Sequence, residues 1–211
     1  MLRILLLALE FSLIFLGVPL LIYYRLLPNL PIPYLLLAGL VTFLLLRYDP
    51  TFDSRRLFVW GDLRGQLLPL LVRDAVFLVL LGLSVRLFAP ELLFSLVKRS
   101  PVLWAAIMLL YPLVSVYPQE LLYRAYFFHR YQPLFGSGWA MLFASALAFG
   151  FVHIILGNWL AVGLSMIGGL LFSLTYWHSG SLLLACLDHA LFGNFIFTIG
   201  LGRFFYHGSR L

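Results

Sequence analysis

Long apolar runs separated by short polar stretches extend along almost the whole chain. Most of these runs approach the roughly 20 apolar residues with which an α-helix crosses the hydrocarbon core of a bilayer. The pattern predicts about seven spans, and hence an all-α, polytopic integral membrane bundle of about seven to eight helices. The runs cover residues 4–24, 31–46, 66–88, 101–118, 139–157, 159–177 and 181–202.

The connections between these runs are the polar parts of the chain. Residues 47–65 and 89–100 hold basic residues that suit a membrane surface, where anionic lipid attracts them. Residues 119–131 follow the fourth run without a break, so we expect them to continue its helix. That helix is predicted to end near Gln132 and Pro133.

Composition narrows the class of protein. The 211 residues are 63% hydrophobic and 10% charged, with a mean hydropathy of +1.02. A soluble domain carries about 25% charged residues, so a soluble globular protein is excluded. The length and the lack of a linker rich in serine, glycine or proline predict a single intramembrane domain over residues 1–211. Glu10 interrupts the first run and no small-residue cleavage pattern follows it, so we expect an uncleaved span.

The charge and the cysteine count limit the partners. The formal net charge is +6, but the basic residues lie in separate loops and not on one hydrophilic face. We therefore expect the lipid bilayer as a partner, no nucleic acid, and a multi-pass location in the cell's inner or plasma membrane. Cys186 is the single cysteine, which excludes an intrachain disulfide and any multi-cysteine metal site.

Ionisable residues inside the apolar runs are the candidates for chemistry, because a charge at bilayer depth is costly and usually faces a cavity. Glu120 and Arg124 are four residues apart and share a helix face, so they can pair. On its own, such a pair is more often a structural salt bridge than a catalytic site.

Two histidines lie in later runs. His153 has wholly apolar neighbours and needs a partner on another helix, while His189 follows Asp188 directly. Adjacent residues on a helix point about 100° apart, so Asp188 and His189 are not a simple pair. We expect Asp188 to cap its helix or to bridge to another one.

Taken together, Glu120, His153 and His189 indicate a site if the bundle brings three spans together. Convergence would supply a general base, water activation and a hydrogen-bond donor for a developing oxyanion. The same three residues also match a catalytic zinc ligand set. The spacing alone leaves both interpretations open, because the His-Glu-x-x-His signature is absent.

Three short motifs in this part of the chain resemble those of one family. Residues 119–124, Gln-Glu-Leu-Leu-Tyr-Arg, resemble the Glu-Glu-x-x-x-Arg motif of the CAAX-processing and bacteriocin-processing (CPBP) intramembrane proteases, also called the Abi or Rce1-like family. Residues 149–153 match its Phe-x-x-x-His motif. Residues 189–193 fall at its third motif, a histidine followed four residues later by asparagine or another polar residue.

The resemblance implies a family-like catalytic core over about residues 101–202, with a cavity open towards the lipid. It also implies an intramembrane endopeptidase that hydrolyses a peptide bond in a membrane-associated peptide or lipidated protein tail. On this hypothesis Glu120 is the base, His153 helps it to orient water, His189 is an oxyanion donor and Arg124 fixes Glu120. We favour a metal-free mechanism and expect no cofactor, with zinc at Glu120, His153 and His189 as the alternative.

Two positions depart from the family pattern. The first motif begins with Gln119, and an amide cannot take a proton from water, so Gln119 is a supporting residue at most. Glu120 takes the role of base if its helix is rotated by one residue's 100°. Gly193 stands where the third motif expects asparagine, and Asn194 is one residue further on.

Two other functions stay open. The first is a catalytically silent member that binds hydrophobic peptides, as an immunity or chaperone-like protein, which Gln119 motivates. The second is a small transporter or channel whose buried ionisable residues relay protons, although the chain shows no inverted repeat. The basic residues are spread nearly equally over alternating loops, so the positive-inside rule does not orient the chain.

Overall fold

The structure is a computed structural model that describes residues 1–59 and 63–205. All the regular secondary structure of these residues is helical and none of it is a strand, which confirms the predicted fold class. The α-helices are α1 (Leu2–Phe11), α2 (Val18–Tyr23), α3 (Pro31–Tyr48), α4 (Leu63–Phe88), α5 (Ser95–Arg99), α6 (Pro101–Tyr111), α7 (Tyr117–Glu120), α8 (Phe127–Arg130), α9 (Gln132–Phe135), α10 (Trp139–Val152), α11 (Trp159–Ser179) and α12 (Leu182–Thr198).

Several α-helices are joined end to end into longer rods. Six helical segments among the described residues, single or joined, are long and apolar enough to cross a membrane, and the chain is an integral, multi-pass membrane protein. The six are Leu2–Tyr23, Pro31–Tyr48, Leu63–Phe88, Pro101–Arg130, Trp139–Leu156 and Trp159–Ser179.

The seventh predicted span is shorter than expected. Helix α12 ends at Thr198 after 17 residues, which at about 1.5 Å per residue is less than the roughly 30 Å of a bilayer core. It stops where Gly200 takes a left-handed φ of 95°. A Cβ on Gly200 would lie 1.9 Å from the carbonyl oxygen of Leu92, so only glycine lets the chain turn so close to that loop.

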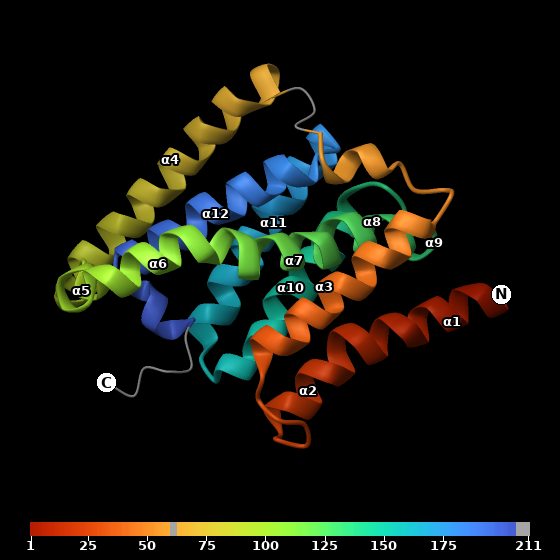
Figure 1. Ribbon diagram of the computed structural model, residues 1–211, viewed down its shortest axis with the longest axis horizontal. Coiled ribbons are helices and arrows are strands. Elements are labelled where there is room, and N and C mark those ends of the chain that lie inside the picture. The colour runs from red at the N-terminus through yellow and green to blue at the C-terminus, as the bar shows by residue number, and fades with distance from the viewer. Residues whose placement is uncertain (60–62, 206–211) are drawn as a thin grey trace.

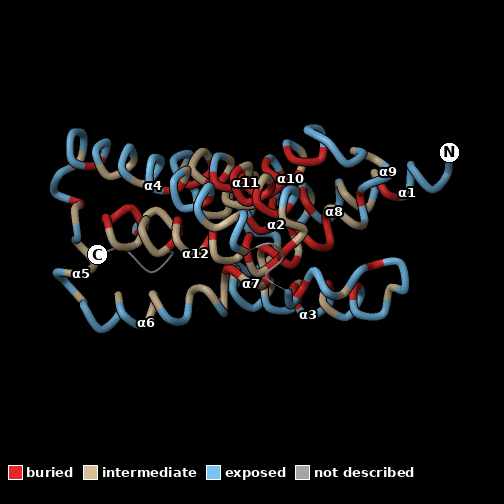
Figure 2. The backbone as a smooth tube through the Cα atoms, turned by 90° about the horizontal axis from the view of Figure 1, so that it is seen from above, coloured by how far each residue is buried: buried red, intermediate tan, exposed pale blue. Residues whose placement is uncertain are grey.

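Helices α10, α11 and α12 lie towards the centre of the bundle, with α4 and α6 running along opposite sides of α12 (Figures 1 and 2). The buried residues gather around α7, α10 and α11, while α4 and α6 are exposed along most of their length (Figure 2). The exposed side chains on these outer helices are largely leucine, valine and phenylalanine, which suits contact with lipid. The best-buried part of the bundle therefore lies inside a largely lipid-facing shell.

The helix from Pro101 to Arg130 is not a regular α-helix. It contains two π-helical segments, Pro112–Val116 and Leu121–Tyr126, on either side of α7. Proline lacks the N–H that an α-helix needs, and a π turn takes in an extra residue and changes which side chains face inward. These segments flank the stretch that carries Glu120, so they set the direction of its side chain.

Candidate active site

Glu120, at the end of α7, is completely buried and points at α12. Its Oε1 accepts a hydrogen bond from Nδ1 of His189 at 2.8 Å, although the two residues are 69 positions apart in the chain. A carboxylate can only accept, so Nδ1 of His189 carries the proton. The bundle therefore joins one predicted acid to one predicted histidine.

Arg124 forms an ion pair with Oε2, the other oxygen of the Glu120 carboxylate. Its Nε lies 3.2 Å from Oε2 of Glu120, which is the i,i+4 pairing expected from the sequence. Its Nη1 donates to Oγ of Ser145 at 2.9 Å and to the carbonyl of Tyr123. The guanidinium also lies over the ring of Phe149, 5.0 Å from its centroid. Both charges are fully buried, so each depends on the other for its stabilisation.

Tyr111 completes the site on the far side of His189. Its hydroxyl lies 3.0 Å from Nε2 of that histidine. In the neutral imidazole Nε2 is the acceptor, so the phenol donates. The imidazole stacks on Phe172 at 4.5 Å between centroids, which fixes the plane of the ring. We call Glu120, Arg124, His189 and Tyr111 the Glu120 cluster.

Gly193 makes room for Tyr111. A Cβ on residue 193 would lie 2.4 Å from the hydroxyl of Tyr111 and 2.3 Å from its ring. The space beside Gly193, where the third motif expects asparagine, is therefore occupied by the phenol of Tyr111 from α6. Sequence reasoning missed Tyr111, because a tyrosine in an apolar run carries no charge and lies 78 residues from His189.

His153 lies near the Glu120 cluster but does not join it. Its Nδ1 donates to the carbonyl of Phe149 at 2.7 Å, one turn back on α10. The Phe149 ring contacts both imidazoles, with centroids 5.1 Å from His153 and 5.4 Å from His189. We expected His153 to work with Glu120 in orienting water, and His189 to serve as an oxyanion donor. In the structure His189 is the partner, because the helix ends at His153 and its Nδ1 satisfies a local carbonyl.

The two supporting residues make other contacts. The amide of Gln119 donates to Oγ of Ser115 at 2.6 Å, one turn back on the same rod. The amide nitrogen of Asn194 is 3.4 Å from the carbonyl of Met108, and its Oδ1 is buried without a hydrogen-bond partner among the described residues. The structure gives neither side chain a hydrogen bond to Glu120 or His189.

Asp188 belongs to a second buried ionic group, which we call the Arg73 cluster. Oδ2 of Asp188 accepts from Nη2 of Arg73 at 2.6 Å and from the hydroxyl of Thr175. The same Nη2 donates to Oδ1 of Asp74 at 2.7 Å. Asp188 therefore bridges to α4 and α11, which is one of the two roles expected for it.

The three residues of the alternative zinc site, Glu120, His153 and His189, do not form a ligand set among the described residues. Nδ1 of His189 is taken by Glu120, and Nδ1 of His153 is taken by a backbone carbonyl. Within residues 1–59 and 63–205, no group of three histidine, cysteine, aspartate or glutamate side chains is placed to bind a metal ion. We therefore derive no step through a metal, and the metal-free mechanism stays a prediction.

Comparison with known proteins gives one family. Residues 101–196 match the family model described as Rce1-like, type II CAAX prenyl endopeptidase Rce1-like. This segment contains all three motifs, from Gln119 to Gly193, and the whole Glu120 cluster. Neither the curated proteins nor the solved structures gave a match.

Proposed function

We propose that this chain hydrolyses a peptide bond in a protein tail held in the membrane, because residues 101–196 match the Rce1-like family model, which describes a type II CAAX prenyl endopeptidase. The substrate class is a membrane-associated C-terminal tail, with prenylated tails as the first to test. The observation that carries the proposal is the 2.8 Å hydrogen bond between Glu120 and His189, buried between two helices of a membrane bundle.

The choice of general base depends on which side-chain atoms a water molecule can approach. Glu120 is completely buried, and its oxygens lie against His189 and Arg124. A general base must come within about 2.6–3.2 Å of the proton that it takes. Glu120 is therefore a positioning residue, which holds the tautomer of His189 as the buried aspartate does in a Ser-His-Asp triad. This assigns the base to Nε2 of His189, in place of the role for Glu120 that the motif implied.

The proposed reaction has two proton transfers. Water attacks the carbonyl carbon of the scissile bond, and its proton passes to Nε2 of His189 after the Tyr111 hydroxyl has turned away from that atom. The imidazolium is stabilised by Glu120. The same proton then passes to the leaving nitrogen as the C–N bond breaks, which yields a carboxylic acid and an amine. His153, whose Nδ1 is bound to the carbonyl of Phe149, is assigned to orient the water through its Nε2.

A cleavage assay on the purified protein in proteoliposomes tests the proposal. With a farnesylated CAAX peptide as substrate, Glu120→Gln should lower kcat by on the order of 10²–10⁴-fold, because an amide does not hold the histidine as a base. Thr175→Val is the matched control, since Thr175 is a buried polar residue of the Arg73 cluster. Equal activity of Glu120→Gln and the control, with wild-type activity present, would reject the mechanism.

A second function, a silent member that binds hydrophobic peptides, is favoured by Gln119 and by the phenol on His189. The variant Gln119→Glu distinguishes a disabled protease from a peptide-binding protein. A gain of cleavage from an inactive wild type supports a disabled protease, and no cleavage with or without the change supports a binder.

A further inference from the structure

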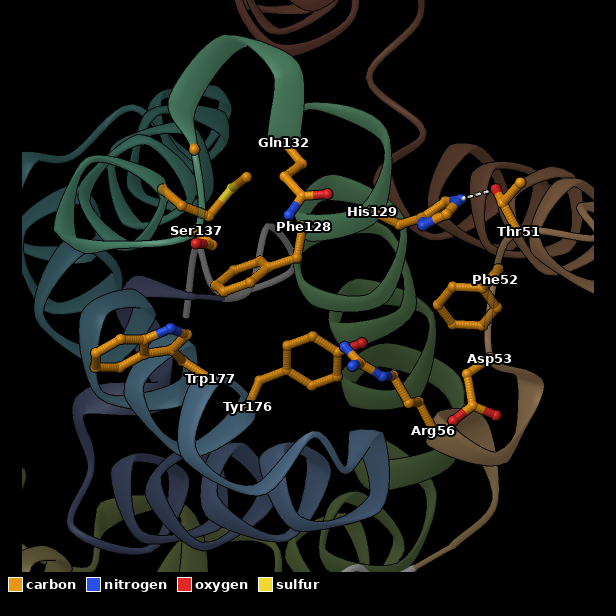
Figure 3. Close-up of a pocket in the computed structure, with 12 residues that line it drawn as sticks. Thr51, Phe52, Asp53, Arg56, Phe128, His129, Gln132, Ser137, Tyr176 and Trp177 are labelled. Atoms are coloured by element: carbon orange, nitrogen blue, oxygen red, sulfur yellow. Dashed lines mark hydrogen bonds between the residues drawn. The ribbon is translucent and has the colours of Figure 1, made fainter.

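A cavity in the molecule lies away from the Glu120 cluster. It is a cavity of about 410 Å³, within the usual size range of ligand pockets (Figure 3). Its lining residues are Thr51, Phe52, Asp53, Arg56, Phe128, His129, Gln132, Gly136, Ser137, Met141, Tyr176 and Trp177. None of them belongs to the Glu120 cluster, so this cavity is separate from the candidate active site.

The cavity is at one end of the spans. It lies beside the loop that follows α3, the last turns of α8 and α11, and the loop that leads into α10. Helix ends of a membrane bundle lie at the boundary between hydrocarbon and water. A ligand at this place is therefore expected to have a polar head and an apolar body.

Arg56 is the one arginine in the lining. Its guanidinium reaches into the cavity beside the hydroxyl of Tyr176 (Figure 3). No ion pair of Arg56 occurs within the described part of the chain. An arginine facing a cavity without a carboxylate partner is suited to bind a phosphate.

The acidic groups nearby have other partners. Oδ1 of Asp53 accepts from the backbone N–H of Arg55 at 3.1 Å, which caps that turn. Asp49 outside the cavity accepts from the Thr51 hydroxyl at 2.6 Å and lies 2.9 Å from Nε2 of His129. These contacts give both carboxylates partners other than Arg56, and Asp53 lines the cavity together with Arg56.

Polar donors and aromatic rings line the rest of the cavity. The amide of Gln132 and the hydroxyl of Ser137 line the opposite side of the cavity (Figure 3). The rings of Phe128, Tyr176 and Trp177 form its wall and suit the glycerol and first acyl carbons of a lipid. We propose that this cavity binds the phosphate headgroup of a membrane phospholipid, with Arg56 as the residue that recognises the phosphate.

Native mass spectrometry of the full chain in a phosphate-free detergent tests this proposal. Phosphatidylglycerol is added to wild type, to Arg56→Gln and to Arg55→Gln, and diacylglycerol with the same acyl chains serves as the phosphate-free lipid. Arg55 is the matched control, because it is exposed in the same turn and does not line the cavity. We expect one tightly retained phospholipid on wild type and Arg55→Gln, and at least about fivefold weaker retention on Arg56→Gln.

Two results would overturn the proposal. The first is equal retention of phospholipid by Arg56→Gln and Arg55→Gln, or equal retention of diacylglycerol by wild type. The second comes from a competition with inorganic phosphate. If free phosphate displaces the lipid at an equal concentration, the cavity is a site for a soluble anion and not for a lipid headgroup.

Discussion

The Glu120 cluster and the Arg73 cluster are both buried ionic groups, and each contains one of two adjacent residues of α12. Asp188 faces Arg73 and Thr175, whereas His189 faces Glu120 and Tyr111. The first cluster contains an imidazole, a group with one ring nitrogen that can accept a proton and one that can donate a proton. The second contains only carboxylates, a hydroxyl and a guanidinium. Burial of charge alone therefore does not identify the candidate active site. The chemical type of the buried groups distinguishes the two clusters.

The two clusters also differ in their access to solvent. Arg124 is completely buried, while the side chain of Arg73 is 25% exposed. Glu120 and Arg124 form a balanced pair, but Arg73 faces two carboxylates. The Arg73 cluster joins α4 to α11 and α12, so we expect it to hold an outer helix on the core.

The largest expected effect comes from breaking the fully buried pair. Arg124→Ala should lower the free energy of unfolding by about 3–5 kcal/mol, because it leaves Glu120 buried without its partner. Arg73→Ala should cost less, since solvent reaches that side chain. Denaturant titration of both variants in detergent micelles measures the difference. The double variant Glu120→Gln, Arg124→Met should recover much of the loss, and equal losses for the two arginines would contradict the comparison.

A smaller effect is expected where Tyr111 meets Gly193. Gly193→Ala places a methyl group in the volume of the phenol, and overpacking of this kind costs about 1–3 kcal/mol. Removing the ring in the double variant Tyr111→Ala, Gly193→Ala should relieve that strain, which a double-mutant cycle of unfolding free energies measures. Additive losses would show that Tyr111 does not fill the space beside residue 193.

The smallest effect belongs to an ion pair outside both clusters. The hydrogen bond from Thr51, and next that from His129, lowers the pKa of Asp49 to about 2. A lowered carboxyl pKa adds stability above the ordinary value of about 3.9, and this is lost as the pH falls through about 2. Thr51→Val should raise the pKa of Asp49, as measured by carboxyl NMR, and should change stability only slightly at neutral pH. An unchanged pKa would remove Thr51 as the cause.

Much of the fold could be predicted from the apolar runs. Their lengths predicted the helices and most of the spans, since a helix needs about 20 apolar residues to cross a bilayer. The length of α12 was overestimated, because the turn at Gly200 depends on a close approach to Leu92 that no local pattern reveals.

The site was predictable where partners share a helix and not where they meet across helices. The pairing of Glu120 with Arg124 follows from their spacing. The choice of His189 over His153 as the partner of Glu120 depends on how the bundle packs, and the π-helical segments beside α7 have no clear sequence signature. Tyr111 was missed because its role depends on a glycine in another helix.

The most direct test compares the two neighbours on α12 in the same assay. The kcat/KM for a farnesylated CAAX peptide is measured in proteoliposomes for wild type, His189→Ala and Asp188→Asn. The account predicts a loss of at least about 10²-fold for His189→Ala and activity near wild type for Asp188→Asn. Full cleavage by His189→Ala, or an equal loss in both variants, would contradict it.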